Sequence, residues 1–250
     1  MREATPLHGR TALVTGAGRR VGAVIARTLH AAGASVVIHH HTSGEAAARL
    51  AAELDGAGPP ARTVAADLSR PDAIDAMLSS LDSLGAFPDL IVNSASNFLT
   101  SPSDRADLDV WEASIDVNLR APYLVTMGAV ARWARAKPPR ADVVNVTDVW
   151  GERPAKGRTA YCVSKAGLIM LTKSLSRELG PDVRVNGVSP GPVLMPADYP
   201  EEARARAVRR TVMKREGRPE DVAEAVLFLV ARTDFATGSI LTVDGGRSVV

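Results

Sequence analysis

The sequence predicts a doubly wound α/β fold, in which a mostly parallel sheet of seven strands carries helices on both faces. Short apolar runs alternate with alanine-rich stretches along the whole chain. The apolar runs are continuous rather than alternating, which is typical of strands that are buried on both faces. Strands that alternate with helices favour parallel pairing. The 250 residues, 46% of them hydrophobic, suit a single domain over 1–250.

Each predicted strand is a β-rich apolar run, and each predicted helix is a longer stretch between two such runs. In chain order, strands are expected at 11–16, 34–40, 62–67, 89–95, 141–147, 182–190 and 239–246. Helices are expected notably at 19–33, 43–58, 109–136 and 158–180. The segment 190–200, "PGPVLMPADYP", carries four prolines after a strand end, so we expect a substrate loop or lid there.

Composition and charge exclude several classes of protein. The 30 basic and 28 acidic residues nearly balance, and the densest basic stretch, "EEARARAVRR" (201–210), mixes both signs. We expect that stretch to be a solvated helix face and expect no nucleic-acid partner. No apolar run reaches the ~18 residues of a membrane span, and "MREATPLHGR" lacks the apolar core of a signal peptide. The single cysteine, Cys162, is expected to be a buried helix residue in a cytoplasmic protein without a metal site.

A glycine-rich loop, "TGAGRRVG" (15–22), joins the first predicted strand to the first helix. Such a loop lets backbone N–H groups approach a pyrophosphate at the helix N-terminus. The second strand ends in "IHHHTS" (38–43), where an NAD site usually carries an acidic residue. Arg19, Arg20, His39, His41 and Ser43 can instead bind a 2′-phosphate, which indicates NADPH.

Three further residues suggest catalysis. Tyr161 and Lys165 are four apart on a predicted helix and share one face. A cationic lysine beside a phenol is expected to lower the pKa of the tyrosine, which would make Tyr161 a proton donor near neutral pH. Asp148 stands thirteen residues before Tyr161.

These motifs, in this order and spacing, resemble those of the short-chain dehydrogenase/reductase family over essentially the whole chain. The matching elements are "TGAGRRVG", "NSAS" (93–96), Asn118 in "DVNLRAPY", "YCVSK", "PGPV" and the terminal "VDGG". The resemblance implies a Rossmann fold, a nicotinamide cofactor and often a homotetramer.

Departures from the general pattern resemble the pteridine reductase branch of that family. Asp148 stands where most members have serine, Arg20 where most have glycine, and "NSAS" where most have "NNAG". The resemblance implies that Phe98 stacks on a pterin, that Ser96 bonds near the cofactor phosphates or the pterin, and that Asn118 supports a water chain behind Lys165. The branch often has a basic residue where Thr42 stands, which leaves Arg20, His39 and Ser43 for the phosphate.

The loop chemistry and the resemblance together give a full set of expected site residues. The catalytic residues are Asp148, Tyr161, Lys165 and Asn118. The cofactor contacts are Gly16, Arg19, Arg20, Val21, Gly22, His39, His41, Ser43, Asp67, Leu68, Asn93, Ala95, Ser96, Tyr161, Lys165, Pro190, Gly191 and Val193. The substrate contacts are Ser96, Phe98, Asp148, Trp150, Tyr161, Leu194 and Met195.

The carboxylate at position 148 bears on the reaction. An ionised aspartate would repel the negative charge that grows on oxygen when a ketone is reduced, whereas a pterin C=N bond needs a proton at nitrogen. The expected function is therefore NADPH-dependent reduction of a dihydropterin or dihydrofolate. A carbonyl reductase, such as a 3-oxoacyl carrier-protein or sugar reductase, and a non-catalytic NADP-binding regulator remain alternatives.

Overall fold

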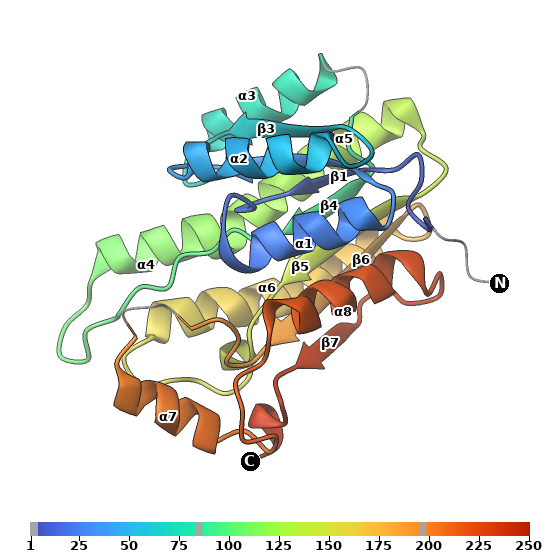
Figure 1. Ribbon diagram of the computed structural model, residues 1–250. Helices are drawn as coiled ribbons and strands as arrows, with labels where there is room; N and C mark the ends of the chain where they lie inside the picture. Colours follow the sequence, from blue (N-terminus) through green and yellow to red (C-terminus); the bar gives the residue numbers. More distant parts are fainter. Residues whose placement is uncertain (1–4, 84–86, 196–198) are drawn as a thin grey trace.

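Seven strands form one sheet at the centre of the molecule (Figure 1), and the computed structural model describes residues 5–83, 87–195 and 199–250. The strands are β1 (Thr11–Val14), β2 (Ser35–His40), β3 (Ala61–Ala65), β4 (Leu90–Asn93), β5 (Ala141–Val146), β6 (Val183–Pro190) and β7 (Ile240–Val243). Their order in the sheet is β3-β2-β1-β4-β5-β6-β7, and every neighbouring pair is parallel. The predicted doubly wound α/β fold is confirmed, and its seven named strands are all parallel.

Helices cover both faces of the sheet. They are α1 (Arg20–Ala31), α2 (Gly44–Asp55), α3 (Pro71–Asp82), α4 (Leu108–Ile115), α5 (Ala121–Ala136), α6 (Thr159–Leu179), α7 (Glu201–Arg209) and α8 (Pro219–Ala231). Apolar residues of α1, α2 and α8 pack in one core cluster, and those of α3, α5 and α6 pack in a second. The neighbours Ala12 and Leu13 of β1 belong to different clusters, so the clusters lie on opposite faces of the sheet (Figure 1).

The helices differ from the sequence prediction in two ways. Helices α3 and α8 lie outside the predicted segments, although each begins with a proline at its first turn, a typical start signal. The predicted helix 109–136 is present as α4 and α5, joined by a single π-helical turn, Asp116–Arg120. Short π turns inside α-helices are frequent at functional sites.

Other expectations from composition can be compared with the structure. Cys162 lies on α6 and is 6% exposed, which confirms that it is a buried helix residue. Helix α7 has no buried residue, as expected for a solvated helix. Among the described residues, no helix is long and apolar enough to cross a membrane, and no cluster of three histidine, cysteine or acidic side chains is placed to hold a metal ion.

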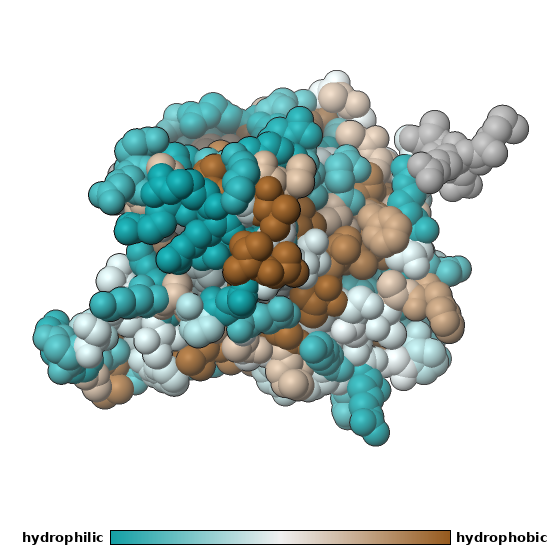
Figure 2. Space-filling view, turned by 90° about the horizontal axis from the view of Figure 1, so that it is seen from below, coloured by the Kyte–Doolittle hydropathy of each residue, from teal (hydrophilic) through white to brown (hydrophobic). Residues whose placement is uncertain are grey.

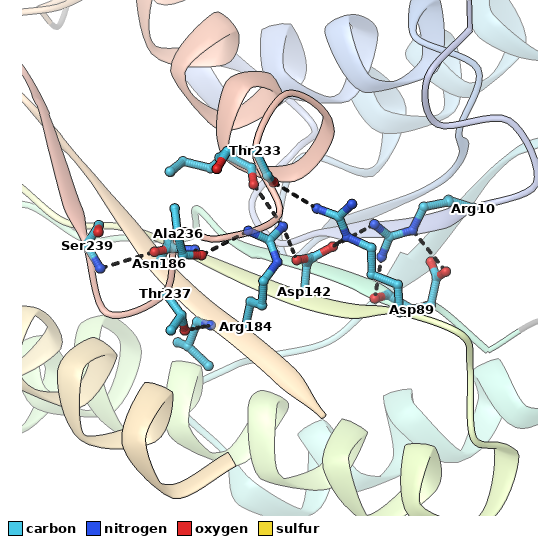
Figure 3. A network of polar contacts seen from close by, with 12 residues as sticks. Arg10, Asp89, Asp142, Arg184, Asn186, Thr233, Ala236, Thr237 and Ser239 are labelled. Atoms are coloured by element: carbon cyan, nitrogen blue, oxygen red, sulfur yellow. Dashed lines mark hydrogen bonds and ion pairs between the residues drawn. The ribbon is translucent and has the colours of Figure 1, made fainter. Parts of the chain in front are cut away.

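An ionic cluster holds the amino ends of the central strands (Figure 3). Asp142, on β5, is 1% exposed and makes ion pairs with Arg10, Arg140 and Arg184. Arg10 also pairs with Asp89, which precedes β4. A buried charge is costly unless it is paired, and several partners share the burial of this carboxylate. The cluster therefore joins β1, β4, β5 and β6 at the amino ends of these strands.

The direction in which the chain adds strands reverses between β1 and β4. Strands β2 and β3 extend the sheet on one side of β1, whereas β4 to β7 extend it on the other. In open parallel sheets, ligands bind outside the carboxyl ends of the strands at such a reversal. The loops that follow β1, β2, β4, β5 and β6 all begin at this edge.

Candidate active site

A cavity of about 770 Å³ lies at the carboxyl ends of the strands. All of the predicted site residues line it except Asn93 and Asn118. Those two are fully buried below it, at 3% and 0% exposure. Lining residues that sequence reasoning did not select are His40, Thr42, Ser94, Asn97, Val117, Val146, Thr147, Val149, Pro192, Tyr199, Ala207 and Arg247.

The glycine-rich loop after β1 is packed too tightly for side chains at two glycines. A Cβ on Gly16, which has φ +66°, would lie 2.8 Å from the Ala95 Cα, and a Cβ on Gly22 would lie 2.6 Å from the Gly16 carbonyl oxygen. Thr15 Oγ1 accepts hydrogen bonds from the Ser94 and Ala95 backbone nitrogens, at 2.9 and 3.0 Å. The loops after β1 and β4 therefore meet closely and leave room above them for a ligand.

Arg20 begins α1 in an unusual backbone conformation. Its φ of +57° lies in the left-handed region that favours glycine. Its guanidinium is exposed, lines the cavity and donates to the Leu194 carbonyl oxygen at 2.5 Å. Arg20 thus joins the glycine-rich loop to the loop after β6.

His39 is organised differently from the predicted phosphate contact. The Gly16 backbone nitrogen donates to Nδ1 at 3.0 Å, and Nε2 lies 3.1 Å from the Ala66 carbonyl oxygen, which it can reach only as a donor. Burial lowers the pKa of His39 to about 4, so the ring is neutral near pH 7. With both ring nitrogens bonded to backbone, His39 supports the glycine-rich loop and offers no charge to a phosphate.

The other residues after β2 and β3 remain open to the cavity. His41 is exposed, with Nε2 4.0 Å from Asp67 Oδ2. Two hydrogen bonds from Ser69 hold the pKa of Asp67 below its ordinary value. Ser43 packs against Gly18, where a side chain would overlap its hydroxyl. Residues 41–43 contain no carboxylate.

The predicted catalytic residues meet at one wall of the cavity. Tyr161, on α6, donates from its hydroxyl to Asp148 Oδ2 at 2.8 Å. The Trp150 backbone nitrogen donates to the other oxygen, Oδ1, at 2.8 Å, so Asp148 also caps the short turn Val149–Gly151. Lys165 Nζ donates to the Val146 carbonyl oxygen at 2.9 Å, and its ammonium lies 5.7 Å from the Tyr161 ring centre.

The expected lowering of the Tyr161 pKa is wrong for this structure. Tyr161 is 5% exposed, and burial together with the adjacent Asp148 raises the pKa of its phenol well above the ordinary value. The lysine lacks a direct contact with the hydroxyl, whereas the carboxylate holds the phenolic hydrogen. A neighbouring negative charge opposes formation of phenolate.

Asp148 and Lys165 are shifted toward their neutral forms. Burial raises the pKa of Asp148 despite its hydrogen bonds from Trp150 and Tyr161. Burial lowers the pKa of Lys165 to about 8, although the charge of Asp148 acts in the opposite direction. Opposite shifts of two nearby groups are typical of sites that exchange protons near neutral pH.

Asn118 links the π turn to the loop after β4. Its amide oxygen accepts hydrogen bonds from Ser96 Oγ at 3.0 Å and from the Asn97 backbone nitrogen at 2.9 Å. Its Nδ2 donates to Ser164 Oγ on α6 at 3.1 Å. Asn118 therefore positions the Ser96–Asn97 segment, and within the described residues its hydrogen bonds do not reach Lys165.

Aromatic side chains form an apolar wall beside Tyr161. The rings of Phe98 and Trp150 are stacked, with centres 5.4 Å apart and planes 30° apart. The Phe98 ring meets the edge of Tyr161 at 4.9 Å. Arg158 lies over the Phe98 ring at 4.0 Å and donates to the Phe98 carbonyl oxygen at 2.9 Å. The wall offers a flat surface for a planar ligand.

The loop after β6 completes the cavity. Leu194 and Met195 line it, as expected, while residues 196–198 of the predicted loop lie outside the described residues. Glu216 accepts from the Met195 backbone nitrogen at 2.6 Å and pairs with Arg204 of α7 at 2.7 Å. Tyr199 is a further lining residue, and its place inside the predicted loop segment could have identified it.

Comparison with known proteins gives matches along almost the whole chain. A family model described as enoyl-(acyl carrier protein) reductase matches residues 16–248. The 3beta-hydroxysteroid dehydrogenase 1 of Eggerthella lenta is 34% identical, over 97% of this chain and 95% of that protein. A 3-oxoacyl-[acyl-carrier-protein] reductase of Aquifex aeolicus is 35% identical, over 96% and 98%. Pteridine reductase 1 of Leishmania tarentolae is 33% identical, over 95% and 96%.

Solved structures match equally well. A blue fluorescent protein from a metagenomic library, in complex with NADPH, is 31% identical with a TM-score of 0.90, over 97% of this chain and 99% of that one. A short-chain dehydrogenase/reductase from Serratia marcescens is 30% identical with the same TM-score and coverage. The named substrates of the relatives differ, so sequence identity alone does not select one.

Proposed function

Because the chain belongs to the short-chain dehydrogenase/reductase family, we propose that it reduces a pteridine C=N bond with NADPH. The substrate would be a dihydropterin or a dihydrofolate. The observation that carries this proposal is the hydrogen bond from Tyr161 to Asp148. A relative named pteridine reductase is 33% identical, and the remaining support comes from the chemistry of the cavity.

NADPH fits the residues at the glycine-rich end of the cavity. The loop around Gly16 and Gly22 brings backbone close to where a pyrophosphate would bind, without side chains in the way. Arg19, Arg20 and Ser43 offer positive charge and a hydroxyl to a 2′-phosphate. A similar structure holds NADPH. When bound, the cofactor supplies the hydride for the reduction.

Asp148 and Tyr161 suit protonation of a ring nitrogen. The carboxyl has a raised pKa and receives the phenolic hydrogen bond, so a proton is held between the two side chains. Reduction of a C=N bond adds hydride to carbon and a proton to nitrogen, and this pair can release that proton. In a ketone reduction, the Asp148 oxygens would instead lie beside the negative charge that develops on the substrate oxygen.

The remaining residues bind the ring and set the charge balance. Phe98 and Trp150 provide a flat apolar wall for a heterocycle beside Tyr161. Lys165 is 2% exposed and oriented by the Val146 carbonyl. Its positive charge would offset the charge of Asp148 when the proton leaves.

Assays of NADPH oxidation test the proposal. We expect turnover with dihydrobiopterin or dihydrofolate and little with an acetoacetyl thioester. Turnover of the thioester without turnover of either pterin would replace the proposal with carbonyl reduction. Absence of turnover with all three, together with tight NADPH binding, would favour a non-catalytic regulator.

Carbonyl reduction is the second candidate, and the relatives favour it. The hydroxysteroid dehydrogenase and 3-oxoacyl reductase relatives are at least as similar as the pteridine reductase. In that case Asp148, when protonated, would take the place of a hydroxyl donor. Burial raises the pKa of the Asp148 carboxyl, but this carboxyl can donate a hydrogen bond only at a pH low enough to keep it protonated.

We also propose a homotetramer. Large apolar side chains are exposed on two parts of the molecule, which suggests two interfaces. One group comprises Leu108 and Trp111 of α4 and Tyr123 of α5, and the other comprises Val212, Met213, Val249 and Val250. Figure 2, which views the molecule from the side where the chain ends, shows apolar residues gathered on that surface. Light scattering should give a mass four times that of the chain, and a monomer would refute the assembly.

A further inference from the structure

Arg247 lines the cavity from the last turn of the chain. It begins the short turn Arg247–Val249, directly after Gly245 and Gly246, which have φ of +62° and +77°. Asp244 fixes this turn, because its two oxygens accept from the Gly246 and Ser248 backbone nitrogens at 2.8 and 2.6 Å. The Arg247 side chain therefore lines the cavity from a fixed backbone.

The guanidinium of Arg247 is half-buried and lacks a direct partner: within residues 5–83, 87–195 and 199–250, its side chain makes no hydrogen bond and no ion pair. The charge of Asp244 acts on it only from a distance, and the Asp244 oxygens bond to backbone nitrogens. Other partly buried arginines differ: Arg10 and Arg184 both pair with Asp142 (Figure 3). A partly buried charge without a partner is costly, and this suggests that a ligand supplies the missing anion.

Two more arginines add positive charge at the same place. Burial lowers the pKa of Arg247, and the nearby charges of Arg210 and Arg153 lower it further, whereas the charge of Asp244 opposes them. Arg153 donates to the Val250 backbone oxygen, and Arg210 has no side-chain partner in the described part of the chain. Of these three arginines only Arg247 lines the cavity, and the charges of the other two strengthen its attraction for an anion.

We propose that Arg247, reinforced by Arg153 and Arg210, binds an anionic group at the end of the substrate remote from the reducible bond. The group would be a carboxylate or a phosphate, the anions that guanidiniums bind best. This inference rests on the proposed function, because it concerns the same cavity. It favours a dihydrofolate, whose glutamate tail carries carboxylates, over a dihydropterin with a neutral side chain.

Two matched substrate pairs test the proposal, each with one anionic and one neutral member. The first pair is dihydrofolate and dihydrobiopterin. The second pair is acetoacetyl-coenzyme A, which carries phosphates, and the acetoacetyl thioester of N-acetylcysteamine, which carries none. KM and kcat are measured for the unaltered enzyme, for Arg247→Gln and for the control Arg62→Gln, which removes one exposed charge from β3.

We expect the enzyme to prefer the anionic member of the active pair through a lower KM. Arg247→Gln should raise that KM about tenfold or more, the scale of one charge-assisted hydrogen bond. In Arg247→Gln, the kcat for the anionic member should change less than about twofold, and so should KM and kcat for the neutral member. In the control Arg62→Gln, KM and kcat for both members should change less than about twofold. Added salt should weaken the preference, because salt screens charge.

The outcomes separate this inference from the proposed function. Turnover of the thioester pair alone, with the expected Arg247 dependence, would refute pteridine reduction and support the anion site. If the unaltered enzyme shows no preference for the anionic member of the pair that it turns over, the anion site is overturned. An equal rise of KM for both members in Arg247→Gln would also overturn it. A change of the oligomeric mass in Arg247→Gln would do the same, because it would assign Arg247 to a subunit interface.

Discussion

The Tyr161 hydroxyl donates to Asp148 Oδ2 over 2.8 Å, so the phenol and the carboxyl share one hydrogen beside the cavity. Groups coupled this closely titrate as a pair rather than as two independent acids. Burial raises the pKa of both groups, and the charge of Asp148 raises that of Tyr161 further, while the pKa of Lys165 falls to about 8. This unit is the part of the site where a single substitution should change the reaction most clearly.

The variant Asp148→Ser removes the carboxyl and restores a neutral hydroxyl. Serine can still cap the turn at Trp150, so the fold should persist. We expect kcat/KM for dihydrobiopterin to fall about a hundredfold, the scale of lost acid–base assistance, while weak activity on a diketone appears. Asp148→Asn, which keeps the shape without an ionisable proton, should also lose the pterin activity. Full pterin activity in Asp148→Ser would remove the main support for the pteridine assignment.

The variant Arg20→Gly separates charge from backbone strain. Glycine accepts the φ of +57° without a Cβ penalty, so the melting temperature should stay the same or rise. We expect the enzyme to prefer NADPH over NADH by more than about tenfold, and the variant to lose roughly 1.5–3 kcal/mol of NADPH binding, the value of a bond to a charged group. NADH binding should hardly change. Equal weakening for both cofactors would show that Arg20 does not recognise the 2′-phosphate.

The variant Phe98→Ala tests the aromatic wall. The substitution removes a ring that contacts both Trp150 and Tyr161, so a pterin should bind about 1–2 kcal/mol more weakly. Calorimetric titration of biopterin into the NADP⁺ complex measures this, and Phe235→Ala, which alters a 99% exposed ring, is the control. An unchanged dissociation constant would limit Phe98 to packing.

His39 should make the fold sensitive to mild acid. Its pKa is about 4 in the folded chain and about 6.5 when unfolded. Between these values the unfolded chain binds the extra proton, so stability rises with pH there and falls as the pH is lowered toward 4. The slope should approach 1.4 kcal/mol per pH unit for one proton. His39→Gln should lose this part of the slope in denaturant unfolding, whereas His8→Gln should keep it.

The sequence was a good guide to the sheet and to the cavity lining. Strands buried on both faces have an unambiguous apolar pattern, and the motifs after β1, β4 and β6 fix which loops meet. Helix α8 is harder to predict, because most of its surface is buried by residues such as Val222, Val226 and Leu229, and the exposed stripe of Glu220 and Glu224 continues into the apolar Phe228. The proline at its start, Pro219, was the available signal.

Two features of the site depend on tertiary contacts that no local pattern predicts. The position of Arg247 in the cavity follows from the path of the chain after β7, and its sequence neighbours give no sign of it. The titration of Tyr161 depends on whether the carboxylate or the lysine reaches its hydroxyl. Spacing along α6 placed Lys165 on the same helix face, but only the fold shows that Asp148 makes the contact.

The ionic cluster around Asp142 has a consequence for how this chain can diversify. Arg10, Arg140 and Arg184 hold strands together at the amino ends, whereas binding residues occupy loops at the carboxyl ends. Because breaking a buried ion pair costs several kcal/mol, the amino end should tolerate few substitutions. The loops carry little of that energy, and outside the tightly packed glycine-rich loop they can exchange residues more readily. The architecture is therefore evolvable: loop substitutions at the carboxyl ends of the strands can change substrate specificity, while the ion pairs at the amino ends keep the chain able to fold.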